Sequence, residues 1–383
     1  MKWVETTFGE FVDCNPMIKC KRNCLVENCE MEDIDANFRY LYPQQGKVYT
    51  GSGSKFQNGD TVFSRITPCL ENGKIAQIKG LKGNVGVGST EFFVFRGKAN
   101  VSYNDFVYYL ANSRYIRKSA ENSMAGASGR QRADLNFIKS RTIRVPEKVE
   151  DQKRIASILS HYDDLIEINK RRIALLEESA RELYKEWFVR MRFPGWRKEK
   201  TTAGIPSEWE IKNISQICDI SAGKDRPEQV SPAKSKEFPY PIYSNGVDNN
   251  GLYGFASSPR VANNCITISA RGTIGFVVLH LFPFVPIVRL LVLVPQKENL
   301  LYYLYLWAKC IPIEGNGTSQ QQLTVPMIGK EKIIIPTEEI LDQFNTYINE
   351  LVGIKDNLIH ANELLSLQRD RLLPRLMSGQ LEV

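Results

Sequence analysis

An internal repeat constrains the fold of this chain more than any other feature of its sequence. Several segments of the first half recur in the same order in the second half. GASGRQRADL, which ends at Leu135, matches GNGTSQQQLT near Leu323, and TIRVPEKVEDQ, which ends at Gln152, matches KIIIPTEEILDQ, which ends at Gln343. The offset between the copies changes along the chain, as expected when two copies share a framework and differ in loop length. We therefore predict two similar domains within one chain.

Each copy opens with a globular part that combines strands with a short helix. TVFSRI and FFVFRG in the first copy, and CITISA and IVRLLVLV in the second, are short apolar runs separated by Gly, Pro and Asn, which is typical of strands. A helix is expected over 104–119 and another over 299–310. We predict an α+β fold with two mixed α/β domains, one over 1–146 and one, with a linker, over 191–336.

A long helix is predicted after each domain, over 147–190 and, with a C-terminal tail, over 337–383. Glu147 to Trp187 contains neither Gly nor Pro, and apolar residues recur at alternating steps of four and three, as in a helix–helix seam. At about forty residues each, the helices would be roughly 60 Å long. We predict that they pair as an antiparallel coiled coil rather than lying separately on their own domains. The predicted contact positions are Ile155, Leu159, Tyr162, Ile166, Asn169, Ile173, Leu176 and Leu183 in the first helix, and Phe344, Tyr347, Leu351, Ile354, Leu358 and Leu365 in the second.

Polar residues of the first helix are given two interpretations. Asn169 interrupts the apolar seam, and a buried polar residue at such a position often fixes the register of a helix pair. The basic residues are interpreted as a solvated face rather than as a DNA site. They are Lys153, Arg154, Lys170, Arg171 and Arg172.

The composition indicates a folded, soluble protein, with 43% hydrophobic and 24% charged residues. The net charge of +7 permits a nucleic-acid partner without requiring one. The stretch 276–295 has the length of a membrane span, but its prolines and β-branched residues favour two buried strands joined by a turn. The polar start, MKWVETTFGE, does not resemble a secretory signal. We expect a cytoplasmic protein without a membrane partner.

The cysteines near the start do not have the spacing of a metal site. Their intervals contain no paired C-x-x-C, and the three histidines lie far away in the sequence. We interpret these cysteines as free thiols in a reducing compartment rather than as zinc ligands. They are Cys14, Cys20, Cys24 and Cys29.

Motifs of the enzymes that process DNA are missing from the sequence. Every Gly-Lys pair lacks the glycine five residues earlier that a phosphate-binding loop requires. The N-P-P-aromatic and D-P-P-aromatic tetrapeptides of adenine methyltransferases are missing, as are H-E-x-x-H and G-x-S-x-G. Three histidines offer little material for acid–base catalysis. We predict a non-catalytic protein, which argues against a fused nuclease–methyltransferase.

These segments resemble the specificity subunit of type I restriction–modification systems. GDTVFSRITPCLENGKIA is similar to a β segment of the family's first domain, and GRQRADL and SQQQLT are similar to the segment before its exit strand. VPEKVEDQKRIASILSHYDDLIE resembles the start of the family's spacer helix, and ELYKEWFVRMRFPGW resembles its end. The resemblance spans nearly the whole chain, in the order recognition domain, spacer helix, recognition domain, spacer helix. The N-terminal cysteine cluster is not a feature that we associate with the family.

The resemblance implies an assembly rather than a solitary activity. Such a subunit binds double-stranded DNA and two DNA adenine methyltransferase subunits, and restriction subunits join the complexes that also cleave DNA. S-adenosylmethionine, ATP and Mg²⁺ would bind those partners, and this chain would bind no cofactor and no metal. Recognition in the family is bipartite, so that each domain reads a few base pairs on either side of an unread spacer.

Candidate DNA-reading residues follow from the chemistry of base edges. Arginine reads guanine through two hydrogen bonds, and Gln or Asn reads adenine in the same way. Asn72 and Ser128 are secondary candidates, expected to contact phosphate or to shape a turn. The candidates are Arg65, Lys74, Arg130, Gln131 and Arg132 in the first domain, and Lys224, Arg226, Arg271, Gln320, Gln321 and Gln322 in the second.

Two domains on a rigid helix pair could contact major-groove faces roughly one helical turn, 34–36 Å, apart. The length of the helices would then set the spacer, and two different domains would read an asymmetric site. The alternative is a non-catalytic scaffold whose domains bind peptides and whose helices bind proteins. Basic and amide side chains gathered on one face of each domain would favour DNA over peptide.

Overall fold

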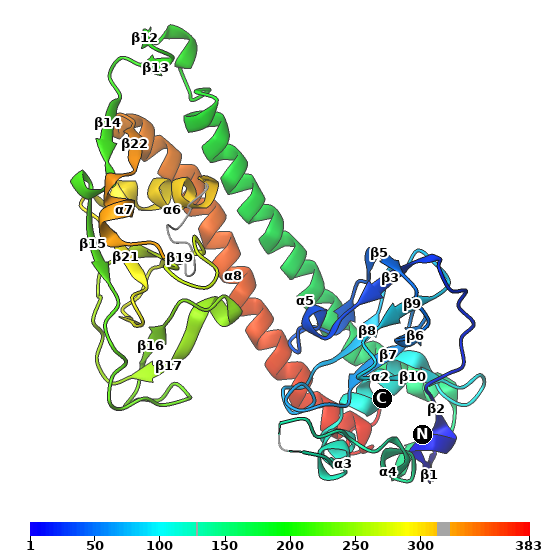
Figure 1. The fold of residues 1–383 in the computed structure, drawn as a ribbon. Helices are drawn as coiled ribbons and strands as arrows, with labels where there is room; N and C mark the ends of the chain where they lie inside the picture. Colours follow the sequence, from blue (N-terminus) through cyan, green and yellow to red (C-terminus); the bar gives the residue numbers. More distant parts are fainter. Residues whose placement is uncertain (128, 312–321) are drawn as a thin grey trace. The chain divides into compact units, whose positions relative to one another are not determined.

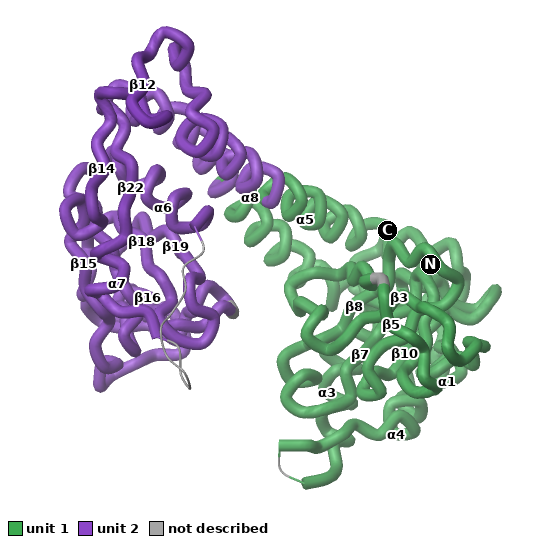
Figure 2. The backbone as a smooth tube through the Cα atoms, turned by 45° about the horizontal axis from the view of Figure 1, so that its top comes forward, with its two compact units in different colours: residues 1–173, 357–383 green, residues 174–356 purple. Residues whose placement is uncertain are grey.

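The computed structural model describes residues 1–127, 129–311 and 322–383 and divides the chain into two compact units (Figures 1 and 2). Unit 1 comprises Met1–Ile173 and Asn357–Val383, and unit 2 comprises Ala174–Asp356. Each unit therefore contains one α/β domain and a segment of both long helices. The predicted boundaries at 146, 190 and 336 separate the helices from the domains, whereas the compact units divide each helix between them.

The domain of unit 1 contains two mixed sheets. Strand order is β2-β10-β7-β8-β4 in the five-stranded sheet and β5-β3-β9-β6 in the four-stranded sheet. A separate antiparallel pair joins β1 (Trp3–Thr7) to β11 (Thr142–Pro146). The remaining strands are β2 (Val12–Cys14), β3 (Leu25–Cys29), β4 (Tyr40–Leu41), β5 (Gln44–Val48), β6 (Ser54–Phe56), β7 (Thr61–Ser64), β8 (Ile75–Ile78), β9 (Gly86–Gly88) and β10 (Phe92–Gly97).

Short helices complete the domain of unit 1, and the helix Asn104–Asn112 packs against β7, β8 and β10 of the five-stranded sheet. The single helix expected over 104–119 is wrong, because the structure has two helices broken at Ser113. Ser113 has extended backbone angles, and its hydroxyl accepts a hydrogen bond from the N–H of Ile116, so that it caps the second helix and ends the first. The helices are α1 (Phe8–Phe11), α2 (Asn104–Asn112), α3 (Arg114–Asn122) and α4 (Leu135–Lys139).

The domain of unit 2 repeats the strand order of the first. Its main sheet runs β15-β21-β18-β19, which matches β2-β10-β7-β8, and the pair of β14 with β22 matches β1 with β11. A smaller sheet runs β17-β16-β20, and β12 pairs with β13. The strands are β12 (Thr201–Thr202), β13 (Ile205–Pro206), β14 (Glu210–Asn213), β15 (Cys218–Ala222), β16 (Tyr240–Tyr243), β17 (Leu252–Ala256), β18 (Cys265–Ile268), β19 (Val277–His280), β20 (Val285–Pro286), β21 (Leu291–Pro295) and β22 (Lys332–Ile335).

The apolar stretch 276–295 lies within these sheets. Strands β19 and β21 flank β18, with β20 between them in the sequence. The structure thus has a third short strand where the sequence predicts only a turn. Unit 2 also contains α6 (Leu301–Cys310) and α7 (Val325–Lys330). Among the described residues, no helix combines the length and the apolar character needed to cross a membrane.

The first long helix, α5 (Val149–Tyr184), continues into a π-helical turn, Lys185–Val189, and the second is α8 (Glu338–Met377). In unit 1, the Asn169 amide donates to Oδ1 of Asn362 at 2.9 Å, and Arg369 pairs with Asp163 at 2.6 Å. Residue numbers therefore rise along α5 as they fall along α8, so that the two helices run antiparallel.

In unit 2 the helices pack in the same sense. Lys355 of α8 lies 3.6 Å from Glu177 of α5. The ring of Trp187 lies 5.6 Å from that of Phe344, measured between centroids. These contacts extend the antiparallel pairing through the part of α5 and α8 that belongs to unit 2.

The seam positions predicted for α8 need a correction of register. Tyr347 is 53% exposed and Ile354 is 44% exposed, although Tyr347 still touches the edge of Trp187. At these two steps of the repeat, the residue that faces α5 is the next one in the sequence, and the same shift continues towards the end of α8. The residues that face α5 are the buried Ile348 and the polar Lys355, Asn362 and Arg369. Three of these four are polar, so that a search for apolar periodicity passes over them.

The other predicted seam residues are covered by neighbours. Ile155, Leu159, Ile166, Asn169, Phe344 and Leu358 are buried, and Tyr162, Ile173, Leu176, Leu183, Leu351 and Leu365 are half-buried. Ile155 and Leu159 also join the core of the first domain, where they meet Phe106 of α2 and Leu376 of α8. The helix pair is thereby part of the hydrophobic core of unit 1.

Candidate nucleic-acid interface

Two segments predicted to read DNA lie side by side in unit 1. The segment after β7 begins with Arg65, and the loop before α4 carries Gln131 and Arg132. The N–H of Thr67 donates to the carbonyl of Gln131 at 3.0 Å, and the N–H of Ala133 donates to the carbonyl of Arg65 at 2.8 Å. The main chain therefore holds these arginines together, although they are far apart in the sequence.

A carboxylate that the sequence did not reveal joins the two arginines. Glu91 accepts from Nε of Arg65 at 3.0 Å, and from Nε and Nη2 of Arg132 at 3.0 and 2.7 Å. Strand β10 pairs with β7 in a register that sets Phe92 opposite Ser64, which brings Glu91 beside Arg65. Hydrogen bonds from Arg132, and then from Arg65, lower the pKa of the Glu91 carboxyl despite its partial burial.

The remaining candidates of unit 1 are arranged differently. Lys74 is half-buried, and its ammonium group donates to the carbonyl of Met31 at 2.8 Å. It therefore holds a neighbouring turn instead of pointing freely to solvent. Arg130 is exposed, and so is Asn72. Ser128 lies outside the described residues.

Candidates of unit 2 gather around one hollow. Lys224, Arg226 and Arg271 line a depression of about 480 Å³. Arg226 donates to the Tyr253 hydroxyl at 3.2 Å, and Arg271 donates to Oε1 of Gln322 at 3.0 Å. The hollow is therefore predominantly basic, with Asp225 as an acidic lining residue and hydrogen-bonding side chains at its wall. Gln320 and Gln321 lie outside the described residues.

The same hollow includes Val288 and Arg289, which sequence reasoning missed. Their φ angles are +53° and +59°, in the left-handed region that non-glycine residues seldom occupy. Backbone hydrogen bonds hold this turn in place: Val288 donates to the carbonyl of Lys224 at 3.0 Å, and Arg289 donates to that of Gly223 at 2.9 Å. Strain of this kind collects at functional sites, and here it directs an extra arginine toward the basic wall.

Asn245 connects that strained turn to the segment of Arg271. Its side-chain amide donates to the carbonyl of Val288 at 2.6 Å, and its side-chain oxygen accepts from the N–H of Ala270 at 2.8 Å. A single side chain thus fixes two walls of the hollow relative to each other. No sequence motif identifies Asn245, since both of its contacts are made across the fold.

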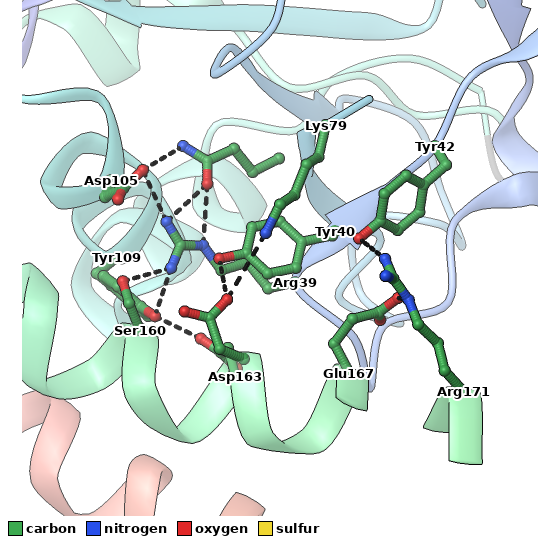
Figure 3. Close-up of polar contacts among 12 residues, drawn as sticks. Arg39, Tyr40, Tyr42, Lys79, Asp105, Tyr109, Ser160, Asp163, Glu167 and Arg171 are labelled. Carbon is green, nitrogen blue, oxygen red and sulfur yellow. Dashed lines mark hydrogen bonds and ion pairs between the residues drawn. The ribbon is translucent and has the colours of Figure 1, made fainter. Parts of the chain in front are cut away.

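A buried polar network attaches the domain of unit 1 to the long helices (Figure 3). The Arg39 side chain is 1% exposed and lies 2.8 Å from Oδ1 of Asp105. It donates to Tyr109 of α2 at 3.0 Å and to Ser160 of α5 at 2.5 Å. Tyr109 in turn donates to Asp163 of α5. The candidate DNA site therefore stands on a domain that is fixed to α5 by charged hydrogen bonds.

The corresponding junction of unit 2 is aromatic. Tyr303 of α6 occupies the position of Tyr109 in the internal repeat. Its ring lies 4.7 Å from that of Phe188, and Phe188 lies 4.8 Å from Phe344 of α8. Trp187 completes this cluster.

Comparison with known proteins identifies the class to which this fold and site belong. Residues 2–178 and 206–361 match the family described as the type I restriction modification DNA specificity domain. The type I restriction enzyme MjaIX specificity subunit of Methanocaldococcus jannaschii is 23% identical over 91% of this chain and 85% of its own length. The HindI specificity subunit of Haemophilus influenzae is 24% identical over 85% of this chain and 87% of its own.

A solved structure has the same fold. It is the S subunit of a type I restriction–modification system from M. genitalium, with a TM-score of 0.53 and 17% identity, covering 98% of this chain and 96% of that one. The two α/β domains and the antiparallel helix pair are therefore the fold of S subunits, as the sequence predicted.

The chain belongs to the type I restriction–modification DNA specificity family, which confirms the predicted resemblance. Specificity subunits are the non-catalytic, DNA-binding components of these systems and assemble with other subunits. The prediction that this chain is not an enzyme is confirmed by that membership.

Proposed function

We propose that this chain reads a bipartite, asymmetric DNA site, with one half read by the loop site of unit 1 and the other by the basic hollow of unit 2. One observation carries the proposal. In each unit, two segments predicted to read DNA are hydrogen-bonded to each other. In unit 1 these are Arg65 and the Arg132 loop, and in unit 2 Leu323 donates to the carbonyl of Ala270 at 3.0 Å, beside Arg271 and Gln322.

The side chains of each site suit the edges of different bases. Arg65 and Arg132 offer paired N–H donors, which match the two acceptors of guanine in the major groove. Gln322 offers an amide, which matches adenine, and the cations of the hollow attract phosphate without regard to sequence. Two sites of different chemistry in one chain would read an asymmetric sequence.

Mapping of methylated adenines in cells that carry the intact system tests this proposal. The double variant Arg65→Ala, Arg132→Ala should relax one half of the methylated motif. Arg271→Ala, Gln322→Ala should relax the other half. Each true base contact contributes about 1–3 kcal/mol of discrimination. If both double variants methylate the unchanged motif, neither site reads DNA, and the peptide-binding scaffold becomes the better interpretation.

The long helices would dock two DNA adenine methyltransferase subunits, and restriction subunits would join complexes that cleave DNA. Support comes from apolar side chains left exposed on both helices, which is typical of partner-binding surfaces. Those in unit 1 are Leu165 and Ile168 of α5 and Ile359, Leu364 and Leu367 of α8, all between 42% and 51% exposed.

A charge placed on these helices tests the docking. Ile168→Glu with Leu364→Glu should lower co-purification of the methyltransferase and leave the melting temperature of the chain unchanged. Lys153→Glu, on the polar face of α5, is the matched control. If the parent chain, the double variant and the control all co-purify the methyltransferase equally, the docking surface lies elsewhere.

Under this proposal the chain binds no cofactor and no metal, and S-adenosylmethionine, ATP and Mg²⁺ bind the partner subunits. Titration calorimetry with the isolated chain and S-adenosylmethionine should therefore give no binding heat. The contribution of this chain would be to hold the methyltransferase at the recognised sequence.

A further inference from the structure

Glu91 is the acidic member of the DNA site in unit 1. Its side chain is 20% exposed and hydrogen-bonds two arginines, Arg65 at 34% and Arg132 at 46% side-chain exposure. The main chain reinforces the contact, because the N–H of Arg65 donates to the carbonyl of Glu91 at 3.0 Å. A carboxylate in a site for polyanionic DNA lowers its attraction for phosphate, so its presence requires another explanation.

The arginine N–H donors that Glu91 leaves free provide this explanation. An arginine carries five N–H donors in a rigid plane. Glu91 occupies Nε of Arg65, and the Nε side of Arg132 through Nε and Nη2. Each terminal nitrogen carries two N–H groups, so Arg132 still has one N–H on Nη2 and both arginines keep donors along the Nη1–Nη2 edge, which is the edge that can bind N7 and O6 of guanine.

We infer that Glu91 is a positioning residue that sets the sequence discrimination of the first half-site. It holds Arg65 and Arg132 in fixed orientations, so that they bind a base edge in preference to any nearby phosphate. Long side chains in water adopt many rotamers, and fixing them in advance favours the partner whose geometry fits. The inference rests on the proposed function, since it presumes that this site reads DNA.

The second site lacks this arrangement among the described residues. There Arg271 donates to the neutral amide of Gln322. A carboxylate, Asp225, also lines that hollow, but in the described part of the chain it forms no ion pair with Arg226, Arg271 or Arg289. The clamp in unit 1 is therefore a property of one half-site and not of the whole fold. This difference provides an internal control.

The test measures binding of the whole chain to duplex DNA over a range of salt concentrations. The duplexes carry the motif found by methylation mapping, the same motif mutated in one half, or random sequence. Glu91→Gln removes the charge with little change of shape. We expect tighter binding to random duplex, a steeper salt dependence by about one ion, and roughly tenfold less discrimination in the first half of the motif. Discrimination in the second half should not change.

Two further variants separate positioning from charge and from folding. Glu150→Gln removes an exposed carboxylate of α5 that pairs with Lys153 at 2.8 Å, and it should leave discrimination unchanged. Glu91→Asp keeps the charge but shortens the side chain, so it should keep the salt dependence and lose part of the discrimination. Thermal melts of all variants report on folding.

The outcomes distinguish this inference from the proposed function. If Glu91→Gln and Glu91→Asp discriminate like the parent while Arg65→Ala, Arg132→Ala relaxes the first half, the site reads DNA and Glu91 does not position it. Equal weakening on cognate and random duplex, with discrimination intact, would also overturn the inference and assign Glu91 a purely structural part. If Arg65→Ala, Arg132→Ala also leaves discrimination in the first half unchanged, the proposed function itself is wrong.

Discussion

Replacing Arg39 with methionine should destabilise unit 1 selectively. The substitution removes an ion pair with Asp105 at 2.8 Å and two hydrogen bonds to Gln77 at 2.9 and 2.7 Å. It also removes the N–H donors that bind the hydroxyl groups of Tyr109 and Ser160. Removing one partner from a buried ion pair costs about 3–5 kcal/mol. Asp105 is 30% exposed and can be rehydrated, so we expect the lower end, about 3 kcal/mol.

Hydrogen exchange followed by mass spectrometry can locate this loss. Peptides from β8 and from the start of α5 should exchange roughly a hundredfold faster, since each tenfold corresponds to about 1.4 kcal/mol. Peptides from unit 2 should keep their rates. Lys2→Met is the control, because Lys2 pairs with Glu147 at the surface, where an ion pair contributes less than about 1 kcal/mol.

Two results would refute this reasoning. Unchanged exchange in β8 and α5 would mean that the buried network contributes little to stability. Equal acceleration in both units would mean that the loss spreads through the long helices and that the units do not unfold separately.

Two other perturbations concern unit 2, which contains every tryptophan except Trp3, so that fluorescence follows its unfolding. Burial lowers the pKa of His280 to about 4 from 6.5, so the unfolded chain takes up the proton first as the pH falls. The free energy of unfolding of the unit should therefore fall by about 3 kcal/mol between pH 6.5 and 4. His280→Gln should flatten that pH dependence, and an equal slope in the variant would exclude His280 as its source. Val288→Gly should stabilise the unit by up to about 1 kcal/mol, because glycine adopts a φ of +53° without strain and Val288 is half exposed. A clear loss of stability in urea would show that the turn is not strained.

The fold was predictable because its signals are local. Short apolar runs bounded by turn residues locate strands such as β7 and β10, and a stretch without Gly or Pro locates α5. The break at Ser113 was not predicted, since one hydroxyl that caps a helix leaves no periodic trace. The register of α8 was also beyond reach, because its seam holds Lys355 and Asn362, whose partners lie on the other helix.

The site could be predicted only in part. Base chemistry selects Arg65 and Arg132 from the sequence, and both lie together in the structure. Glu91 was missed because it reaches them only through the pairing of β10 with β7. Arg289 was missed because its position depends on a left-handed turn, for which neither it nor Val288 has the expected residue type.

The two domains are attached to the long helices by different contacts, which explains how each of two similar domains could pair with its own helix segment. Tyr109 and Tyr303 occupy matching positions, yet Tyr109 donates to a carboxylate of α5 while Tyr303 packs among aromatic rings and donates to the carbonyl of Ile334. If the first domain sat on the aromatic segment of the helices, Arg39 would lose its hydrogen bond to Ser160 and Tyr109 would lose its hydrogen bond to Asp163, at a cost of about 1.5–3 kcal/mol each. Each domain is therefore matched to its own helix segment. The asymmetric DNA site that we propose would require such matching, because exchange of the two domains would invert the order of the half-sites.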